Sequence, residues 1–187
     1  MIFLEKFNNK KNIRFEMFKK VFGISLERDH KLIVETGTSR GKKKFFFLKK
    51  YNWKDGMSTV MFANYAKYVK GHLHTCDISA DNINKAKKFT EEFSEHISFY
   101  VDDSLSFLQH FNKSIDLLYL DSLDGHNPAL ASKHQLNEAK IAVNKLSQNS
   151  LILLDDKGSK TNLSVNFLLN RNFKIIFETK FQILLSK

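Results

Sequence analysis

Four acidic residues each follow a short apolar run that has the length of a buried strand. Glu35 closes LIV, Asp77 follows LHTC, Asp121 follows DLLYL and Asp155 follows LILL. In an open α/β sheet the carboxyl ends of the parallel strands meet at one edge, and ligands bind in the crevice there. Four carboxylates gathered at such an edge predict a polar site for a small molecule.

Glycine-containing turns surround the first of these acids. The segment 35–39 reads ETGTS, a basic and aromatic insert follows, and the pattern resumes with DGMST around Gly56 and Ser58. Gly37 allows a close approach of the backbone to a ligand, and Gly56 allows a tight entry to a helix. Such turns suit an adenosyl cofactor as well as a dinucleotide. Asp77, at the end of the second strand, is spaced to accept hydrogen bonds from two ribose hydroxyls.

Strands alternate with helices along most of the chain. The expected strands are 31–35, 73–76, 97–101, 115–120 and 151–154, and the expected helices are 10–22, 58–69, 79–93, 104–111, 129–145 and 161–170. Two β-rich runs around 178–180 predict a closing hairpin. This order predicts an α/β, Rossmann-like fold with a seven-stranded, mostly parallel sheet, helices on both faces and a C-terminal antiparallel hairpin. We expect one domain over 1–187, with a helical extension over 1–30 whose helix ends at Gly23.

The composition is that of an ordinary globular protein, with 42% hydrophobic residues. The single cysteine, Cys76, excludes a disulfide framework. No apolar stretch approaches the roughly 20 residues that span a bilayer, and we see no signal peptide, so we expect a cytoplasmic protein without a membrane partner. The net charge of +10 is nearly all lysine. It fits a solvated lysine surface, and it also fits an anionic partner such as an acidic substrate or nucleic acid.

Several of these segments together resemble a known family. The ExGxx…GxS turn, the acid in CDI (76–78), VDDS (101–104) and LDS (120–122) are similar to class I S-adenosylmethionine-dependent methyltransferases. The closest resemblance is to the small-molecule O-methyltransferase branch, which includes catechol O-methyltransferase-like and macrocin-type enzymes. It runs from about Leu32 to the C-terminus. It implies an enzyme that transfers a methyl group from S-adenosylmethionine to a small-molecule acceptor.

The resemblance implies cofactor contacts at the first two strand ends. Glu35, Gly37 and the adjoining Thr38 would line the methionine and ribose part of the cofactor. Ser58, after Gly56, would bind the cofactor carboxylate near the positive end of a helix. Asp77 would take the ribose hydroxyls. An alternative for Glu35 is an ordinary solvated strand end.

The remaining cofactor positions follow along the same edge. Ile78 adjoins the ribose acid, and Asp103 and Ser104 would border the adenine. Asp121 would lie beside the sulfonium and the acceptor, which makes it a catalytic candidate as well as a cofactor contact. Asp103 and Ser104 also fit an ordinary helix cap, because both residue types are common there.

A metal is a further expectation from the resemblance. Asp121, Asp155 and Asp156 offer three hard oxygen ligands, which suit Mg²⁺ or Ca²⁺. Metal-dependent O-methyltransferases have an Asp-Asn pair where this chain has Asp-Asp. A bound Mg²⁺ would orient two acceptor oxygens and lower the pKa of the one to be methylated. The alternative is that 155–158 (DDKG) forms a simple polar turn.

The catalytic base departs from the family pattern. Catechol-type enzymes have a lysine three residues after the first metal aspartate, and this chain has Asp124 there. His126 is the better candidate for the base. It lies on the same loop, and an unperturbed histidine has a pKa of about 6.5. The alternative is an ordinary surface histidine.

The insert over 40–55 is basic and aromatic. Its aromatic residues fit a lid over the cofactor entrance, and its lysines would attract an anionic substrate. The same cluster also fits a homodimer contact. Two other functions stay open: a nucleic-acid methyltransferase, which the charge and the insert favour, and a non-catalytic S-adenosylmethionine-binding module. Against the nucleic-acid function, the chain lacks an Asn/Asp-Pro-Pro-aromatic motif after the fourth strand.

Overall fold

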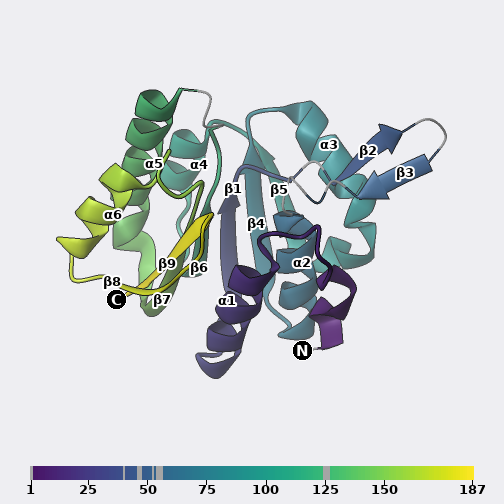
Figure 1. Ribbon diagram of the computed structural model, residues 1–187, viewed down its shortest axis with the longest axis horizontal. Helices are drawn as coiled ribbons and strands as arrows, with labels where there is room; N and C mark the ends of the chain where they lie inside the picture. Colours follow the sequence, from purple (N-terminus) through teal and green to yellow (C-terminus); the bar gives the residue numbers. More distant parts are fainter. Residues whose placement is uncertain (1, 40, 46–47, 52, 54–56, 124–126) are drawn as a thin grey trace.

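The structure is a computed structural model that describes residues 2–39, 41–45, 48–51, 53, 57–123 and 127–187. Over 42–45 and 48–51 only the backbone is described. The main sheet has seven strands in the order β5-β4-β1-β6-β7-β9-β8 (Figure 1). Their bounds are β1 Leu32–Thr36, β4 His72–Asp77, β5 Ile97–Val101, β6 Ile115–Leu120, β7 Leu146–Asp155, β8 Lys174–Glu178 and β9 Gln182–Ser186.

The strand directions confirm the predicted fold class. The strands β5, β4, β1, β6 and β7 run parallel, whereas β9 runs antiparallel to β7 and β8 antiparallel to β9. Parallel strands covered on both faces have continuous apolar sequences. The run Leu151, Ile152, Leu153 and Leu154 shows this, since none of the four is more than 1% exposed. The antiparallel hairpin closes the sheet at one edge.

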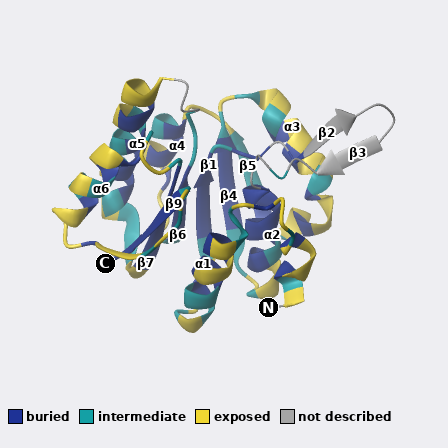
Figure 2. Ribbon diagram, in the orientation of Figure 1, coloured by how far each residue is buried: buried dark blue, intermediate teal, exposed yellow. Residues whose placement is uncertain are grey.

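The helices form two layers, one on each face of the sheet (Figure 1). Their bounds are α1 Phe15–Glu27, α2 Ser58–Tyr68, α3 Ala80–Phe89, α4 Ser104–His110, α5 Pro128–Ala142 and α6 Asn162–Leu169, with short 3-10 helices at Ile2–Phe7, Glu91–His96 and Val143–Lys145. Figure 2 shows the buried strands between helices whose outer faces are exposed.

Neighbouring strand residues serve different layers of the core. Ile33 packs in the cluster with Phe22 and Phe62 from α1 and α2. The next residue, Val34, packs in the cluster with Phe107 from α4 and with residues of α5 and α6. This alternation is the period of two that a strand imposes. The sheet therefore separates two apolar cores and leaves its strand ends for a site.

The first helix differs from its prediction. We expected it to end at Gly23, but α1 continues to Glu27. Glycine inside a helix costs roughly 1 kcal/mol relative to alanine, which makes it a weak stop signal. The buried face of α1, with Phe18 and Phe22 fully covered by the core, outweighs that cost. The helix predicted over 79–93 also ends early, at Phe89, and a 3-10 helix follows.

The insert contains an antiparallel hairpin of β2 Lys42–Phe45 and β3 Leu48–Tyr51. In Figure 1 this hairpin extends outward past α3. Gly41 at its base has φ +68°, and an added Cβ would lie 2.1 Å from the Phe89 ring. Trp53 packs against the core cluster of α1 and α2. The other aromatic side chains of the predicted lid lie outside the described residues.

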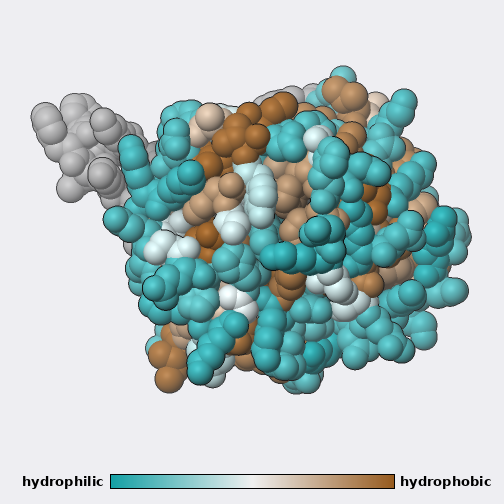
Figure 3. All heavy atoms as spheres, turned by 180° about the vertical axis from the view of Figure 1, so that it is seen from behind, coloured by the Kyte–Doolittle hydropathy of each residue, from teal (hydrophilic) through white to brown (hydrophobic). Residues whose placement is uncertain are grey.

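None of the helices in the described part of the chain combines the length and the apolar character that a membrane-spanning segment needs. The face seen from behind in Figure 3 is largely hydrophilic, with separate hydrophobic areas between the polar residues. This surface accords with a charge that is spread over many lysines.

Candidate active site

The turn after β1 joins three strand ends. Gly37 has φ +85°, a left-handed conformation that favours glycine, and its N–H donates to the Cys76 carbonyl of β4 at 2.8 Å. A Cβ at this position would lie 2.2 Å from the backbone oxygen of Asp121. The Asp121 N–H donates to the Thr36 carbonyl at 2.9 Å. Gly37 therefore lets the turn after β1 pack closely against the strand end at Asp121, whereas its close approach to a ligand stays a prediction.

Glu35 lies beneath this turn and is fully buried. Its carboxylate accepts hydrogen bonds from the hydroxyls of Ser58 at 2.6 Å, Thr59 at 2.8 Å and Thr75 at 2.7 Å. Burial raises the pKa of Glu35 to about 7, although the three hydrogen bonds oppose the rise. The alternative of a solvated strand end is therefore wrong.

These contacts give Glu35 and Ser58 a structural role in the site. Both side chains are buried, Ser58 being 2% exposed, and they bind each other instead of facing open space. They hold the start of α2 against β1 and β4, which is a supporting role. Their direct contact with the cofactor stays a prediction, as does that of Gly56, which lies outside the described residues.

Asp77 ends β4 and is fixed in orientation. Its carboxylate accepts from the Thr38 N–H at 3.2 Å, from the Ser79 N–H at 2.8 Å and from the Asn82 side chain at 3.2 Å. A carboxylate has about four acceptor positions, and this residue is partly exposed. The adjoining Ile78 side chain is 75% exposed. A rigid acid beside an exposed apolar residue suits a ribose that carries a flat base.

Asp103 and Ser104 lie at the next strand end. Asp103 is the N-cap of α4 and accepts from the N–H groups of Leu105 at 2.9 Å and Ser106 at 3.2 Å. The helix-cap alternative is thus confirmed for Asp103. Ser104 is 6% exposed, and its hydroxyl lies 2.9 Å from His134 Nε2 on α5. A border to the adenine stays a prediction for both residues.

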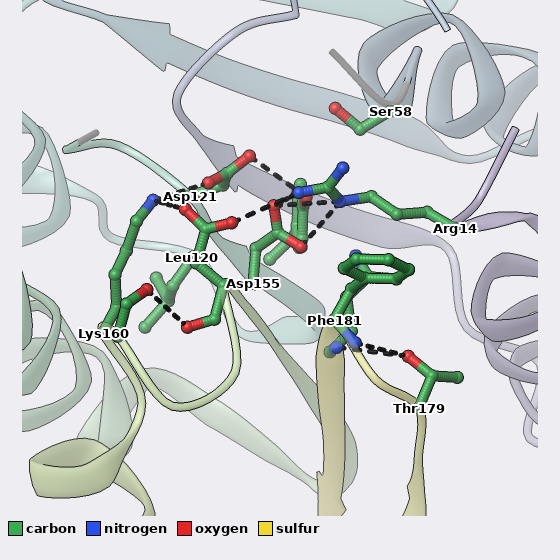
Figure 4. A network of polar contacts seen from close by, with 12 residues as sticks. Arg14, Ser58, Leu120, Asp121, Asp155, Lys160, Thr179 and Phe181 are labelled. Carbon is green, nitrogen blue, oxygen red and sulfur yellow. Dashed lines mark hydrogen bonds and ion pairs between the residues drawn. The ribbon is translucent and has the colours of Figure 1, made fainter. Parts of the chain in front are cut away.

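The structure brings Asp121, Asp155 and Asp156 together. One carboxylate oxygen from each lies within 4.8 Å of the others at the ends of β6 and β7. Two cationic side chains enter the same cluster from different sides (Figure 4). Lys160 Nζ lies 2.9 Å from Asp121 Oδ1 and 2.9 Å from Asp156 Oδ2. Arg14, from the start of α1, donates to both oxygens of Asp155.

The protonation of this cluster follows from its charges. Burial alone would lower the pKa of Lys160, but the Asp121 and Asp156 carboxylates raise it above its ordinary value. Burial and the neighbouring Asp155 carboxylate raise the pKa of Asp121, and Lys160 opposes that rise. Asp121 also accepts a hydrogen bond from the Tyr119 hydroxyl at 3.2 Å. Lys160 therefore stays charged beside a carboxylate that is hydrogen-bonded on both oxygens.

This donor set fits a divalent metal poorly. Mg²⁺ takes oxygen ligands in near-octahedral geometry at about 2.1 Å, so at least one carboxylate oxygen must be free to bind it. Arg14 occupies both oxygens of Asp155, and the Lys160 ammonium lies between Asp121 and Asp156. A metal would have to displace or share these cations. We therefore derive no chemical step through a metal.

Sequence reasoning did not find Arg14 or Lys160. A signal existed for Lys160, because it follows Asp156 by four residues in DDKGSK, a spacing that brings side chains together in a helical turn. Arg14 lies 141 positions before Asp155, and no local pattern connects them. The predicted base His126 lies outside the described residues.

A seven-stranded Rossmann-like sheet with a C-terminal antiparallel hairpin, a glycine turn after β1 and an acid ending β4 fits the class of S-adenosylmethionine-dependent methyltransferases. The chain belongs to the methyltransferase-domain family, whose model matches residues 53–157, and it is an enzyme of that class. No curated protein matches the chain significantly.

Solved structures with the same fold act on different acceptors. An S-adenosylmethionine-dependent O-methyltransferase from Thermotoga maritima is 11% identical, with TM-score 0.64 over 92% of this chain and 64% of that one. An rRNA methylase from Streptococcus thermophilus is 11% identical, with TM-score 0.55 over 90% and 94%. The N-methyltransferase NodS from Bradyrhizobium japonicum, in complex with S-adenosylhomocysteine, is 13% identical, with TM-score 0.59 over 100% and 96%. The fold therefore leaves the acceptor open.

Proposed function

We propose that the protein transfers the methyl group of S-adenosylmethionine to an oxygen of a small molecule. The cofactor would lie across the ends of β1 and β4, with its ribose on Asp77 and its methionine part over the Gly37 turn. The observation that carries this placement is the Asp77 carboxylate, which is held by the Thr38 N–H of that turn at 3.2 Å. This hydrogen bond thus links the Gly37 turn and Asp77, the two places where the cofactor is predicted to bind.

The acidic cluster favours a small hydroxyl acceptor over a nucleic acid. With all three carboxylates ionised, Asp121, Asp155 and Asp156 carry three negative charges against the two positive charges of Arg14 and Lys160, which leaves one in excess. A phosphate backbone would be repelled at this strand end, whereas a hydroxyl could donate a hydrogen bond to a carboxylate.

The reaction would be an in-line displacement. A lone pair of the acceptor oxygen forms the new bond to the methyl carbon, the pair of the carbon–sulfur bond returns to sulfur, and the hydroxyl proton leaves to a base. Asp121 would lie beside the acceptor, and His126 remains the predicted base. Because the sulfonium is already activated, correct placement of the two reactants supplies most of the catalysis.

A nucleic-acid acceptor is the second candidate, and the β2–β3 hairpin favours it. The hairpin register sets Lys43 opposite Lys50 and Lys44 opposite Lys49. Like charges at facing positions are destabilising, so an anionic partner along the hairpin would relieve repulsion. The β2–β3 hairpin lies outside the main sheet, whereas the acidic cluster lies at the ends of β6 and β7, where the acceptor would bind.

Calorimetry with S-adenosylhomocysteine tests the cofactor site. Asp77→Asn should weaken binding by about 10- to 100-fold, because hydrogen bonds to a charged acceptor contribute about 1.5–3 kcal/mol. Asp81→Asn is the matched control, since Asp81 is exposed on α3 and forms an ion pair with Lys85 at the surface. Unchanged affinity in Asp77→Asn would contradict the placement.

Radiolabelled cofactor tests the acceptor. Label should enter hydroxyl-bearing small molecules, and their methylation should depend little on salt. Transfer to RNA or DNA that falls steeply with rising salt would instead support the second candidate.

A further inference from the structure

We propose that Lys160 is the built-in cation of this active site: it takes the place between Asp121 and Asp156 that a divalent metal would need, and it positions Asp121 for a metal-independent reaction. The cation claim stands on the geometry of the cluster alone. The positioning claim rests on the proposed O-methyl transfer. The two claims have separate tests.

Lys160 is buried between two carboxylates. Its side chain is 2% exposed, and its ammonium lies 2.9 Å from one oxygen of Asp121 and 2.9 Å from one oxygen of Asp156. A lysine side chain loses much conformational freedom on burial, so a buried lysine needs compensating contacts. The two carboxylates supply them.

The backbone around Lys160 fixes its direction. Asp156 has φ +56°, and its carbonyl accepts from the Lys160 N–H at 3.1 Å. The Lys157 N–H donates to the Phe181 carbonyl at 2.8 Å, which ties the turn to the neighbouring end of β9. The turn before α6 therefore presents Lys160 to the strand ends of β6 and β7, as Figure 4 shows.

The two cationic side chains leave little attraction for a further cation. Arg14 pairs with Asp155 and Asp156, and Lys160 pairs with Asp121 and Asp156. A divalent ion at the centre of the cluster would stand beside both of these positive groups, and its repulsion from them is strong in a partly buried site. The two cations belong to different elements, so one local movement does not remove both.

The proposed role of Lys160 in the reaction acts through Asp121. Lys160 holds Oδ1 of this carboxylate, and the Tyr119 hydroxyl lies 3.2 Å from Oδ2. The backbone of Asp121 packs on the Gly37 turn, which places the carboxylate beside the proposed cofactor site. An acceptor could then be oriented by a single hydroxyl. A metal site would instead favour two neighbouring oxygens that chelate the ion.

Manganese binding tests the cation claim, with the paramagnetic resonance signal of free Mn²⁺ as the readout. Wild-type protein should leave the signal unchanged. Lys160→Met removes one positive charge from the cluster and should create a site that lowers the signal. Lys157→Met is the matched control, because this lysine lies on the same turn and pairs with Glu178. It should behave like the wild type.

Two results would overturn the cation claim. One is Mn²⁺ binding by the wild type that Asp121→Asn abolishes. The other is a folded Lys160→Met variant that binds no more Mn²⁺ than the control. If Lys160→Met does not fold, Lys160→Gln replaces it, and the wild-type measurement alone still decides whether the native cluster takes a metal.

Kinetics test the positioning claim. Wild-type activity should be the same in EDTA as in Mg²⁺. Lys160→Met should lower kcat by up to about 100-fold, the effect of a small misplacement, while affinity for S-adenosylhomocysteine is kept. Lys160→Arg should restore part of kcat. Loss of activity in EDTA, or an unchanged kcat in Lys160→Met, would overturn the claim.

If the proposed O-methyl transfer were wrong, the results would differ from those that overturn the role of Lys160. No hydroxyl acceptor would be methylated by the wild type, while the Mn²⁺ results would be unaffected.

Discussion

Arg14 donates to both carboxylate oxygens of Asp155, through Nε at 2.9 Å and a terminal nitrogen at 2.8 Å, across 141 positions of sequence. The two side chains are 12% and 1% exposed. The guanidinium also lies 5.8 Å from the centre of the Phe181 ring. This pair attaches the start of α1 to the end of β7, so the N-terminal helical segment forms part of the reaction edge.

Removal of the Arg14–Asp155 ion pair should strongly destabilise the folded protein. Arg14→Met leaves Asp155 buried without its charge partner, which should lower the free energy of unfolding by about 3–5 kcal/mol. Asp155→Asn in the same chain should recover part of the loss. Lys31→Met, which breaks the exposed pair with Asp29, should cost no more than about 1 kcal/mol. Urea denaturation measures all three, and equal losses for Arg14→Met and Lys31→Met would refute the expectation.

Two glycines should respond in opposite directions to alanine. Gly37→Ala puts a Cβ 2.2 Å from the Asp121 backbone at φ +85°, so it should destabilise by more than about 1 kcal/mol and weaken cofactor binding. Gly23→Ala has open space inside α1 and should stabilise by about 0.5–1 kcal/mol. Thermal unfolding distinguishes them, and a neutral Gly37→Ala would show that the turn tolerates a side chain.

Glu35 should make the protein less stable as the pH rises. Its pKa is raised from 4.5 to about 7 in the folded state, so between these values the folded protein binds more protons than the unfolded chain. Below the lower value there is no penalty, and above the upper value the full penalty of about 3 kcal/mol applies. Glu35→Gln should remove this dependence.

The measurement for Glu35 is the difference in unfolding free energy between variant and wild type at several pH values. The difference should shift in favour of Glu35→Gln as the pH rises from about 5 to 8. Glu27→Gln, at an exposed position on α1, is the control and should give a constant difference. A constant difference for Glu35→Gln as well would show that the carboxylate titrates normally.

His74 should have the opposite effect in an overlapping range. Burial first, then Lys113 and His72, lower the pKa of His74 from 6.5 to about 4. The stabilising contribution of neutral His74 is therefore complete above pH 6.5 and is lost as the pH falls toward 4. His74→Gln should unfold less readily in acid than the wild type, relative to their stabilities at pH 7.

Because Glu35 and His74 act in opposite directions, the wild-type pH profile alone does not separate them. The imidazole proton signals of His74 give a direct reading, and they should titrate well below those of an ordinary histidine. A signal that titrates near 6.5 would contradict the lowered pKa.

The sequence alone determined the sheet, the order of its elements and the closing hairpin. The physical reason is that burial on both faces requires continuous apolar strands, and this pattern is visible locally. The residues that end those strands could be placed on one edge for the same reason. Gly37 and the gathering of Asp121, Asp155 and Asp156 were therefore predictable.

Only the tertiary structure decided what these side chains meet. Glu35 proved to be buried under three hydroxyls, and the acidic cluster proved to contain Arg14 and Lys160. Such partners come from elements far apart in the chain, and their meeting depends on helix packing and on side-chain direction. A strand pattern fixes where a carboxylate stands, but the packing of the whole chain decides whether a metal, a lysine or solvent stands beside it.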